Sequence, residues 1–382
     1  MIILLLIVAI ALGVFYGILQ LAISGVWKFA LIFIEMALVS QLLIRQYKLS
    51  SELGLVLLKS KKGIEIIEKL AQKDKVFNLF ADIGSSISYG LLSFVLMRKT
   101  SSVATVVSGL LILAFLSFLV APTAFIFLFQ VLKVGAVDKS VTGISNNTET
   151  GLLIVGGILL IGGLFLFILS GIIFYGAVIF NALVKSIFLG SDAISNTAPG
   201  GTFLLPGVNL PLFEGVIALA IVMVVHEGAH AVLARIAKVP ILSSGIVLFG
   251  IIPVGAFVEP DEKKLSKVEE SKQTRVLVAG ATSNLFTSCA FFLMFMGVVM
   301  VINNFGLMQS DYAPVVMFIY LTLGLTFALN FIVGAVNLLP VPLFDGYRII
   351  DVNIKNKIIV KALMYVTLFF FILNFLPWFF QR

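Results

Sequence analysis

Two histidines and a glutamate stand close together in the stretch VVHEGAHAVL, residues 224–233. On an α-helix, His226 and His230 are four residues apart and project from one face, so both imidazoles can bind one metal ion. Glu227 lies beside them, where a carboxylate can accept and donate protons. Zinc binds imidazole well, and a site with three protein ligands keeps a fourth position for water, whose pKa the metal lowers to about 7. The spacing therefore predicts a hydrolytic zinc site of the HExxH type.

A simpler interpretation makes these histidines two polar side chains that hydrogen-bond to neighbouring helices in a bundle. The chain, however, contains only two histidines, and both fall at the spacing that a metal ion needs. The surrounding residues are apolar, and ionisable groups at membrane depth are costly and commonly functional. The metal site is therefore the favoured hypothesis.

A third ligand must be a carboxylate, because no third histidine exists. Asp345 in NLLPVPLFDGYRI, residues 337–349, is the first candidate. Pro340 and Pro342 break a helix just before it and free backbone groups that a polar cavity tolerates and lipid does not. The alternative for Asp345 is a simple turn with Gly346. Rival carboxylates stand in the charged run VEPDEKK, namely Glu259 and Glu262.

The composition of the chain indicates the solvent around these residues. The 382 residues are 60% hydrophobic and 12% charged, which is too apolar for a soluble domain of this length. The net charge of +7 comes from basic residues in short loops between apolar runs, which is typical of membrane topology and not of nucleic-acid binding. The single cysteine, Cys289, cannot form an internal disulfide. We therefore expect an all-α polytopic membrane protein that contacts the lipid bilayer and no nucleic acid.

Apolar runs of suitable length predict about nine transmembrane helices. These runs lie at residues 2–23, 27–44, 79–97, 103–132, 151–185, 214–237, 275–302, 314–339 and 360–380. The run 151–185 is long enough to tilt or to break near Gly171. Residues 48–75 mix apolar and charged side chains, which predicts amphipathic helices on the membrane surface. Residues 241–258 carry Gly and Pro within an apolar run and predict a small β-hairpin after the zinc-binding helix.

The same pattern divides the chain into three regions and predicts its orientation. The regions are an N-terminal transmembrane hairpin with cytoplasmic amphipathic helices (1–78), additional transmembrane helices (79–190) and a catalytic membrane core (191–382). Basic residues concentrate in 45–75, 235–275 and 345–361, so these loops are expected on the cytoplasmic side. We therefore expect a multi-pass protein of the cell membrane with its active site toward the cytoplasm.

Two motifs together resemble the site-2 protease family of intramembrane zinc metalloproteases, peptidase family M50. They are HEGAH, which begins at His226, and N-x-x-P-x-P-x-x-D-G, which runs from Asn337 to Gly346. The segment LLPGVNLPL before the first motif resembles archaeal and eukaryotic-like members. The segment AGATSNL resembles the middle core helix of the family, and a simple hydrogen bond between helices is one interpretation of its Asn284. The resemblance covers residues 200 to 350, whereas the first 190 residues match loosely.

The resemblance implies a role for each motif residue. His226, His230 and Asp345 would hold one zinc ion per chain. Glu227 would move a proton from water to the leaving amine. Asn337 would position the substrate or stabilise the oxyanion, although an asparagine at this place can also be a helix cap. The implied substrate is a transmembrane protein that is cleaved within its membrane segment in regulated intramembrane proteolysis.

Two other classes of protein stay open at this point. A membrane HExxH protease of the prenyl-protein or heat-shock type would take a glutamate as its third ligand. A transporter or a non-catalytic membrane scaffold would carry the motif without hydrolysis. The hairpin at 241–258 suits a protease, because an exposed strand edge can pair with an unwound substrate by strand addition.

Overall fold

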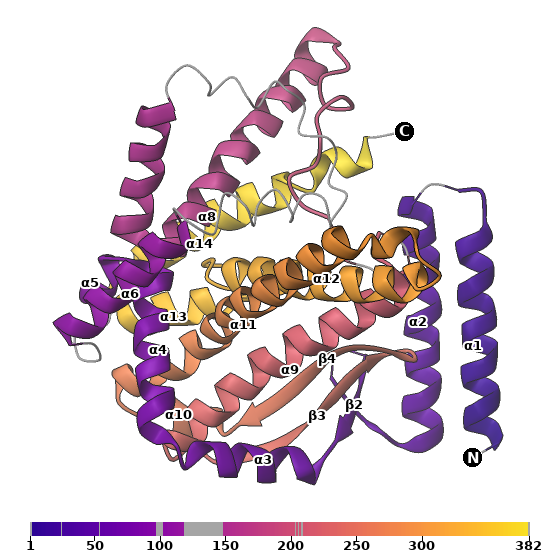
Figure 1. Ribbon diagram of the computed structural model, residues 1–382, viewed down its shortest axis with the longest axis horizontal. Coiled ribbons are helices and arrows are strands. Elements are labelled where there is room, and N and C mark those ends of the chain that lie inside the picture. Colours follow the sequence, from indigo (N-terminus) through magenta and orange to yellow (C-terminus); the bar gives the residue numbers. More distant parts are fainter. Residues whose placement is uncertain are drawn as a thin grey trace.

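The computed structural model describes residues 2–96, 102–117 and 148–380, apart from residues 24, 53, 203, 205 and 208. Within these residues, seven helices are long and apolar enough to cross a membrane. They are α1 (Ile2–Gln20), α2 (Gly25–Tyr47), α8 (Thr148–Leu189), α9 (Leu212–Ile236), α11 (Glu270–Phe305), α12 (Ala313–Val336) and α14 (Lys357–Leu373), which continues into the 3₁₀ turn η4 (Leu376–Phe379). A small antiparallel sheet accompanies them, so the predicted helical, polytopic fold is confirmed (Figure 1).

Two of the expected spans differ from this pattern. The span expected at 79–97 falls, as far as residue 96, into two shorter helices, α4 (Asp74–Tyr89) and α5 (Leu92–Leu96), and Gly90 between them has a left-handed φ of 55°. The last turns of α4 are buried against other helices, because its serines and Asp82 are too polar to face lipid. The span expected at 103–132 begins as α6 (Val103–Phe115), and its part beyond residue 117 lies outside the described residues.

The long helix α8 breaks at Gly163 and not near Gly171. The backbone of Gly163 packs against Gly90, since a Cβ atom on Gly163 would lie 2.6 Å from the Gly90 nitrogen. At the break, the Leu160 carbonyl accepts a hydrogen bond of 2.9 Å from the backbone nitrogen of Leu91. Because Gly90 and Gly163 have no side chains, the backbone of α8 can cross the end of α4 in direct contact with it.

The sheet has the strand order β1-β2-β3-β4, and neighbouring strands are antiparallel. Its strands are β1 (Ser50–Glu52), β2 (Leu55–Lys59), β3 (Ile241–Phe249) and β4 (Ile252–Pro260). β3 and β4 form the predicted hairpin. β1 and β2 were not expected, because the amphipathic helices predicted for 48–75 begin only with α3 (Lys61–Ala71). Val56 of β2 pairs with Leu248 of β3, so β2 covers one side of the hairpin and β4 is left as an edge strand.

The tip of the hairpin lies against α2. The backbone nitrogen of Gly250 donates a hydrogen bond of 2.7 Å to Ser40 Oγ, and the rings of Phe249 and Phe33 are 5.0 Å apart. Gly250 has a φ of 63°, and a Cβ atom there would lie 2.5 Å from Met36 Sδ. Because α2 is long and apolar enough to cross a membrane, the hairpin tip lies beside a membrane-spanning helix.

Helix α9 lies between the sheet and the helix pair α11 and α12 (Figure 1). The pair packs closely, since a Cβ atom on Gly334 of α12 would lie 3.1 Å from the Cβ atom of Asn284 on α11. Two short helices complete this core, α10 (Glu262–Leu265) after the hairpin and α13 (Asp345–Asn353) after the proline-containing loop. The last third of α9, the first half of α11 and the start of α13 thereby meet.

Candidate metal centre

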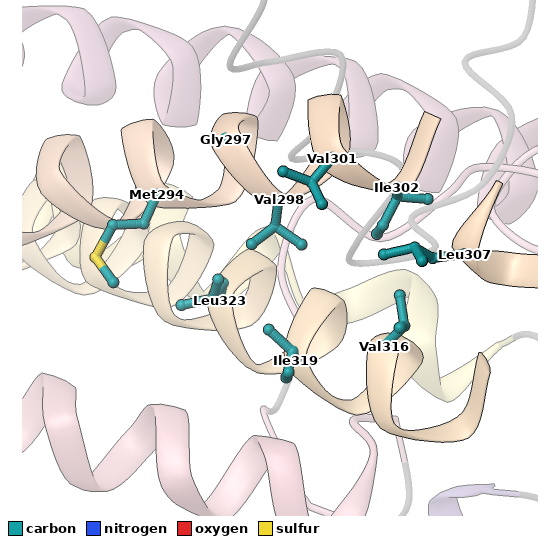
Figure 2. A pocket seen from close by; sticks show the side chains of 9 residues that line it. All are labelled: Met294, Gly297, Val298, Val301, Ile302, Leu307, Val316, Ile319 and Leu323. Atoms are coloured by element: carbon teal, nitrogen blue, oxygen red, sulfur yellow. The ribbon is translucent and has the colours of Figure 1, made fainter. Parts of the chain in front are cut away.

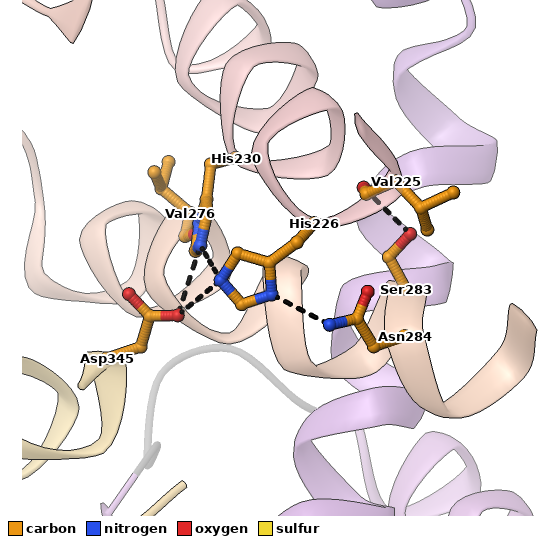
Figure 3. A network of polar contacts seen from close by, with 7 residues as sticks. All are labelled: Val225, His226, His230, Val276, Ser283, Asn284 and Asp345. Atoms are coloured by element: carbon orange, nitrogen blue, oxygen red, sulfur yellow. Dashed lines mark hydrogen bonds and ion pairs between the residues drawn. The ribbon is translucent and has the colours of Figure 1, made fainter. Parts of the chain in front are cut away.

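Three possible ligand atoms from two distant parts of the chain form a small triangle. Oδ2 of Asp345 lies 3.1 Å from Nε2 of His226 and 3.1 Å from Nε2 of His230, and the two nitrogens are 3.2 Å apart (Figure 3). His226 is buried, and the other two side chains are largely enclosed. Within the described part of the chain, no other three or more histidine, cysteine or carboxylate side chains converge in this way.

The triangle fits a metal ion. Zinc binds imidazole nitrogen and carboxylate oxygen at about 2.0–2.2 Å, so ligand atoms on one ion lie roughly 3–3.5 Å apart. Burial alone would raise the pKa of the Asp345 carboxyl, but the charge of His230 and hydrogen bonds from both imidazoles hold that pKa below its ordinary value. Asp345 is therefore ionised at neutral pH, as a metal ligand must be.

Helix α11 orients both imidazoles. His226 and His230 leave the same face of α9, and α11 packs against that face. The Nδ1 atom of His230 lies 2.7 Å from the carbonyl oxygen of Val276, and Nδ1 of His226 lies 3.1 Å from Nδ2 of Asn284. Gly280 stands midway between these two partners, where a Cβ atom would lie 2.6 Å from Cε1 of His226. The three α11 residues are four apart and share one face, so they form a cradle for the two rings.

A closed loop positions the carboxylate. Asp345 is the first residue of α13, and the backbone nitrogen of the next residue, Gly346, donates a hydrogen bond of 2.7 Å to the carbonyl oxygen of Asn337. A Cβ atom on Gly346 would collide with the carbonyl oxygen of Leu338. Only glycine therefore lets the loop return to the end of α12, and the simple-turn alternative for Asp345 does not describe this arrangement.

Glu227 and Asn337 lie outside the triangle. Glu227 is half-buried on α9 and makes no hydrogen bond to any described residue. Asn337 is the C-cap residue of α12 and is also half-buried, and its side chain makes no hydrogen bond to the described residues either. Asn337 therefore caps the helix by its position, and its side-chain amide is available for another partner.

The rival carboxylates lie elsewhere. Glu259 on β4 accepts a hydrogen bond from Ser243 Oγ across the hairpin. Glu262 at the start of α10 forms an ion pair of 2.6 Å with Nη2 of Arg348. Neither glutamate joins the two histidines, so the geometry favours Asp345 as the third ligand.

An ion pair connects α4 with the cradle on α11. The Asp82 carboxylate accepts hydrogen bonds from Nε and Nη2 of Arg275, at 2.7 and 2.8 Å. The two side chains are 12% and 22% exposed, and Arg275 directly precedes Val276. Sequence reasoning assigned no role to this pair, because partners 193 positions apart form no local pattern.

A cavity of about 440 Å³ lies between α11 and α12, away from the triangle (Figure 2). Its lining comes from α11, α12 and the 3₁₀ turn η3 (Leu307–Gln309). The lining residues are Met294, Gly297, Val298, Val301, Ile302, Leu307, Val316, Ile319 and Leu323. None of them is titratable, so the cavity is not the centre of hydrolytic chemistry.

Comparisons with known proteins concern the same part of the chain. Residues 214–375 match the sequence profile of peptidase family M50. This part of the chain is similar to peptidase family M50. The M50 region contains both histidines, Glu227, Asn337 and Asp345, and it includes four of the seven long apolar helices. The match indicates a metallopeptidase, and the long apolar helices indicate a membrane protein.

A shorter stretch resembles one curated protein. Over 106 residues, the chain is 36% identical to the uncharacterized protein MJ0971 of Methanocaldococcus jannaschii. The match covers 28% of this chain and 28% of that protein, so most of each chain lies outside it. No solved structure matches the chain. The M50 match contains the candidate site, and the helices and strands before residue 214 lie outside it.

Proposed function

We propose that this protein is an intramembrane zinc metalloprotease of the site-2 type, which hydrolyses peptide bonds in the transmembrane segments of other membrane proteins. One observation carries the proposal. The two imidazole Nε2 atoms and Oδ2 of Asp345 lie 3.1–3.2 Å apart, and the histidines stand on a helix long and apolar enough to cross a membrane. The M50 domain supports the same function.

The chemistry follows from the residues around the triangle. His226, His230 and Asp345 would hold a zinc ion, which would supply a Lewis acid that lowers the pKa of water and polarises the scissile carbonyl. Glu227 takes a proton from the attacking water and delivers it to the leaving amine as the C–N bond breaks. The amide of Asn337, at the end of α12, holds the substrate backbone or donates a hydrogen bond to the developing oxyanion.

The sheet supports an extended substrate. Peptide bonds in a helix are protected by their own hydrogen bonds, so a transmembrane segment must unwind before hydrolysis. β2 pairs with β3 and occupies one side of the hairpin, which leaves the edge of β4 for a substrate strand. β4 packs against α9, the helix that carries the two histidines (Figure 1). A strand added to β4 would therefore run close to the metal centre.

We place the active site near the cytoplasmic face. At the end of α9, Arg235 forms an ion pair of 3.1 Å with Glu68 of α3. Arg348 of α13 joins α10 through Glu262. The three loops rich in basic residues therefore gather at the histidine-bearing end of α9, and such loops are usually cytoplasmic.

The proposed function is tested by zinc content together with cleavage of a model transmembrane substrate. Purified wild-type protein should hold about one zinc ion per chain and cleave the substrate. Glu227→Gln should keep zinc and lose cleavage, whereas His226→Ala and His230→Ala should lose both. Glu214→Gln, which changes a carboxylate at the opposite end of α9, is the matched control and should keep both.

Three results would contradict the proposal. Full zinc retention in both histidine variants would exclude this metal site. Wild-type cleavage by Glu227→Gln would exclude its role in proton transfer. Zinc binding without cleavage of any transmembrane substrate would favour a scaffold or a transporter.

A further inference from the structure

We infer that Asn284 is a positioning residue for His226, and that its side-chain amide turns over when zinc binds. The inference rests on the proposed zinc site and deepens it. Asn284 is not a metal ligand, and it acts on the metal only through the imidazole of His226. The consequence is a preference for one tautomer of His226.

The contact between Asn284 and His226 lies in the interior of the protein. Nδ2 of Asn284 is 3.1 Å from Nδ1 of His226, and Asn284 has no exposed surface (Figure 3). A Cβ atom on Gly334 of α12 would lie 3.1 Å from the Cβ atom of Asn284, so the two helices are in close contact at this residue. Oδ1 of Asn284 is enclosed and has no hydrogen-bond partner among the described residues. A half-turn of the amide would pair Oδ1 with His226 and leave the NH₂ group unpaired instead, so the tautomer of His226 decides which orientation is favoured.

The observed orientation suits the metal-free site. An amide NH₂ group can only donate, so Nδ1 of His226 must accept from it. A neutral imidazole that accepts at Nδ1 carries its proton on Nε2, and this proton points at Oδ2 of Asp345, 3.1 Å away. His230 differs from His226, because its Nδ1 donates to the Val276 carbonyl at 2.7 Å and already carries a proton.

Zinc binding requires the other tautomer of His226. A metal ion takes the lone pair of Nε2, so the proton of the neutral ring must move to Nδ1. The protonated Nδ1 of His226 would then face the NH₂ group of Asn284, and because both groups are donors, no hydrogen bond could form between them. A half-turn of the amide removes this conflict, because Oδ1 becomes the acceptor for the Nδ1 proton. The imidazole gains and loses one proton, so its charge does not change.

The tautomer of His226 can be observed directly. The chain has two histidines, so labelling with ¹⁵N-histidine gives only two imidazoles to assign. In wild-type protein freed of zinc with a chelator, Nδ1 of His226 should be unprotonated, and after zinc loading both Nδ1 atoms should be protonated. An unprotonated Nδ1 of His226 in the zinc-loaded protein would overturn the inference, and this measurement needs no variant.

Zinc affinity provides the second readout. Asn284→Leu removes the acceptor at similar volume, and we expect it to weaken zinc binding roughly 10–100-fold in a chelator competition assay. Asn284→Asp supplies a carboxylate oxygen as acceptor, and its zinc affinity should stay close to that of wild type. A merely structural role predicts the reverse order, because leucine suits a buried helix interface and a carboxylate does not.

Asn330→Leu is the matched control. Asn330 is also fully buried, lies on α12 and leaves its Oδ1 without a partner among the described residues, but its NH₂ group bonds to the Thr326 carbonyl of its own helix. Its zinc affinity should equal that of wild type. Equal weakening by Asn330→Leu and Asn284→Leu, or no weakening by Asn284→Leu, would overturn the inference. A wild-type protein that binds no zinc would instead contradict the proposed function.

Discussion

Gly280 on α11 and His226 on α9 are in such close contact that a Cβ atom on Gly280 would lie 2.6 Å from Cε1 and 2.7 Å from Nε2 of the imidazole. The same Cβ atom would lie even closer to Nε2 of His230. The Nε2 atoms of His226 and His230 therefore both border the space that is free because Gly280 has no side chain. Any larger residue at position 280 must displace the rings or separate the two helices.

We expect Gly280→Ala to weaken zinc binding roughly 10–100-fold, because the added methyl group moves both imidazoles out of the triangle. Chelator competition on the purified protein measures this change. Gly297→Ala lies on the same helix with nothing within 4 Å of the new Cβ atom, and it should leave zinc affinity unchanged. Similar zinc affinities in the two variants would show that the cradle is not needed for metal binding.

The third ligand can be identified by comparing carboxylate variants. Asp345→Ala should abolish cleavage and weaken zinc binding by more than the roughly 10–100-fold typical of outer-shell changes. Glu259→Ala and Glu262→Ala should keep zinc near one ion per chain, because these side chains bond to Ser243 and Arg348 instead. Zinc loss in a glutamate variant with retention in Asp345→Ala would assign the protein to the glutamate-ligand class.

The ion pair between Asp82 and Arg275 should stabilise the packing of α4 on α11. Asp82→Asn removes the charge opposite a largely buried guanidinium, and we expect it to lower the free energy of unfolding by about 1–3 kcal/mol. Glu68→Gln breaks the pair with Arg235, whose side chains are 39% and 51% exposed, and should cost less than about 1 kcal/mol. Unfolding in mixed detergent micelles measures both values. Equal effects would mean that burial does not strengthen the first pair.

Strand addition to β4 can be tested by disulfide crosslinking in a Cys289→Ser, Glu227→Gln background, which should bind substrate without cutting it. Single cysteines at Val254, Ala256 and Val258 should each crosslink to a different substrate position, with the preferred position shifting by two residues each time. A cysteine at Ser51, on the outer strand β1, is the control and should not crosslink. Crosslinks without a regular shift would contradict strand addition.

The orientation in the membrane predicts which engineered thiols a membrane-impermeant reagent can reach. In Cys289→Ser protein, cysteines at the exposed positions Lys264 and Lys355 should react only after the cytoplasmic side is opened. A cysteine at Asp311, which is exposed between η3 and α12, should react in intact cells. The opposite labelling pattern would place the metal centre on the other side of the membrane.

The spacing of His226, Glu227 and His230 could be interpreted from the sequence because a helix places residues four apart on one face whatever surrounds it. The membrane environment could also be predicted from the sequence, since long apolar runs must be covered by lipid or by each other. The hairpin after α9 was visible in glycines and prolines that interrupt an apolar run. These features depend on local chain geometry and composition.

The tertiary structure decided how distant segments meet. The sequence offers three carboxylates that could bind a metal ion, namely Asp345, Glu259 and Glu262. Only the return of the loop through Gly346 brings Asp345 to the two histidines, which lie more than 100 positions earlier in the chain. β2 pairs with β3 although its sequence resembled part of a surface helix, because an apolar strand can satisfy its backbone only beside another strand. Periodicity reveals which face of an element is apolar, but it does not say which other element covers that face.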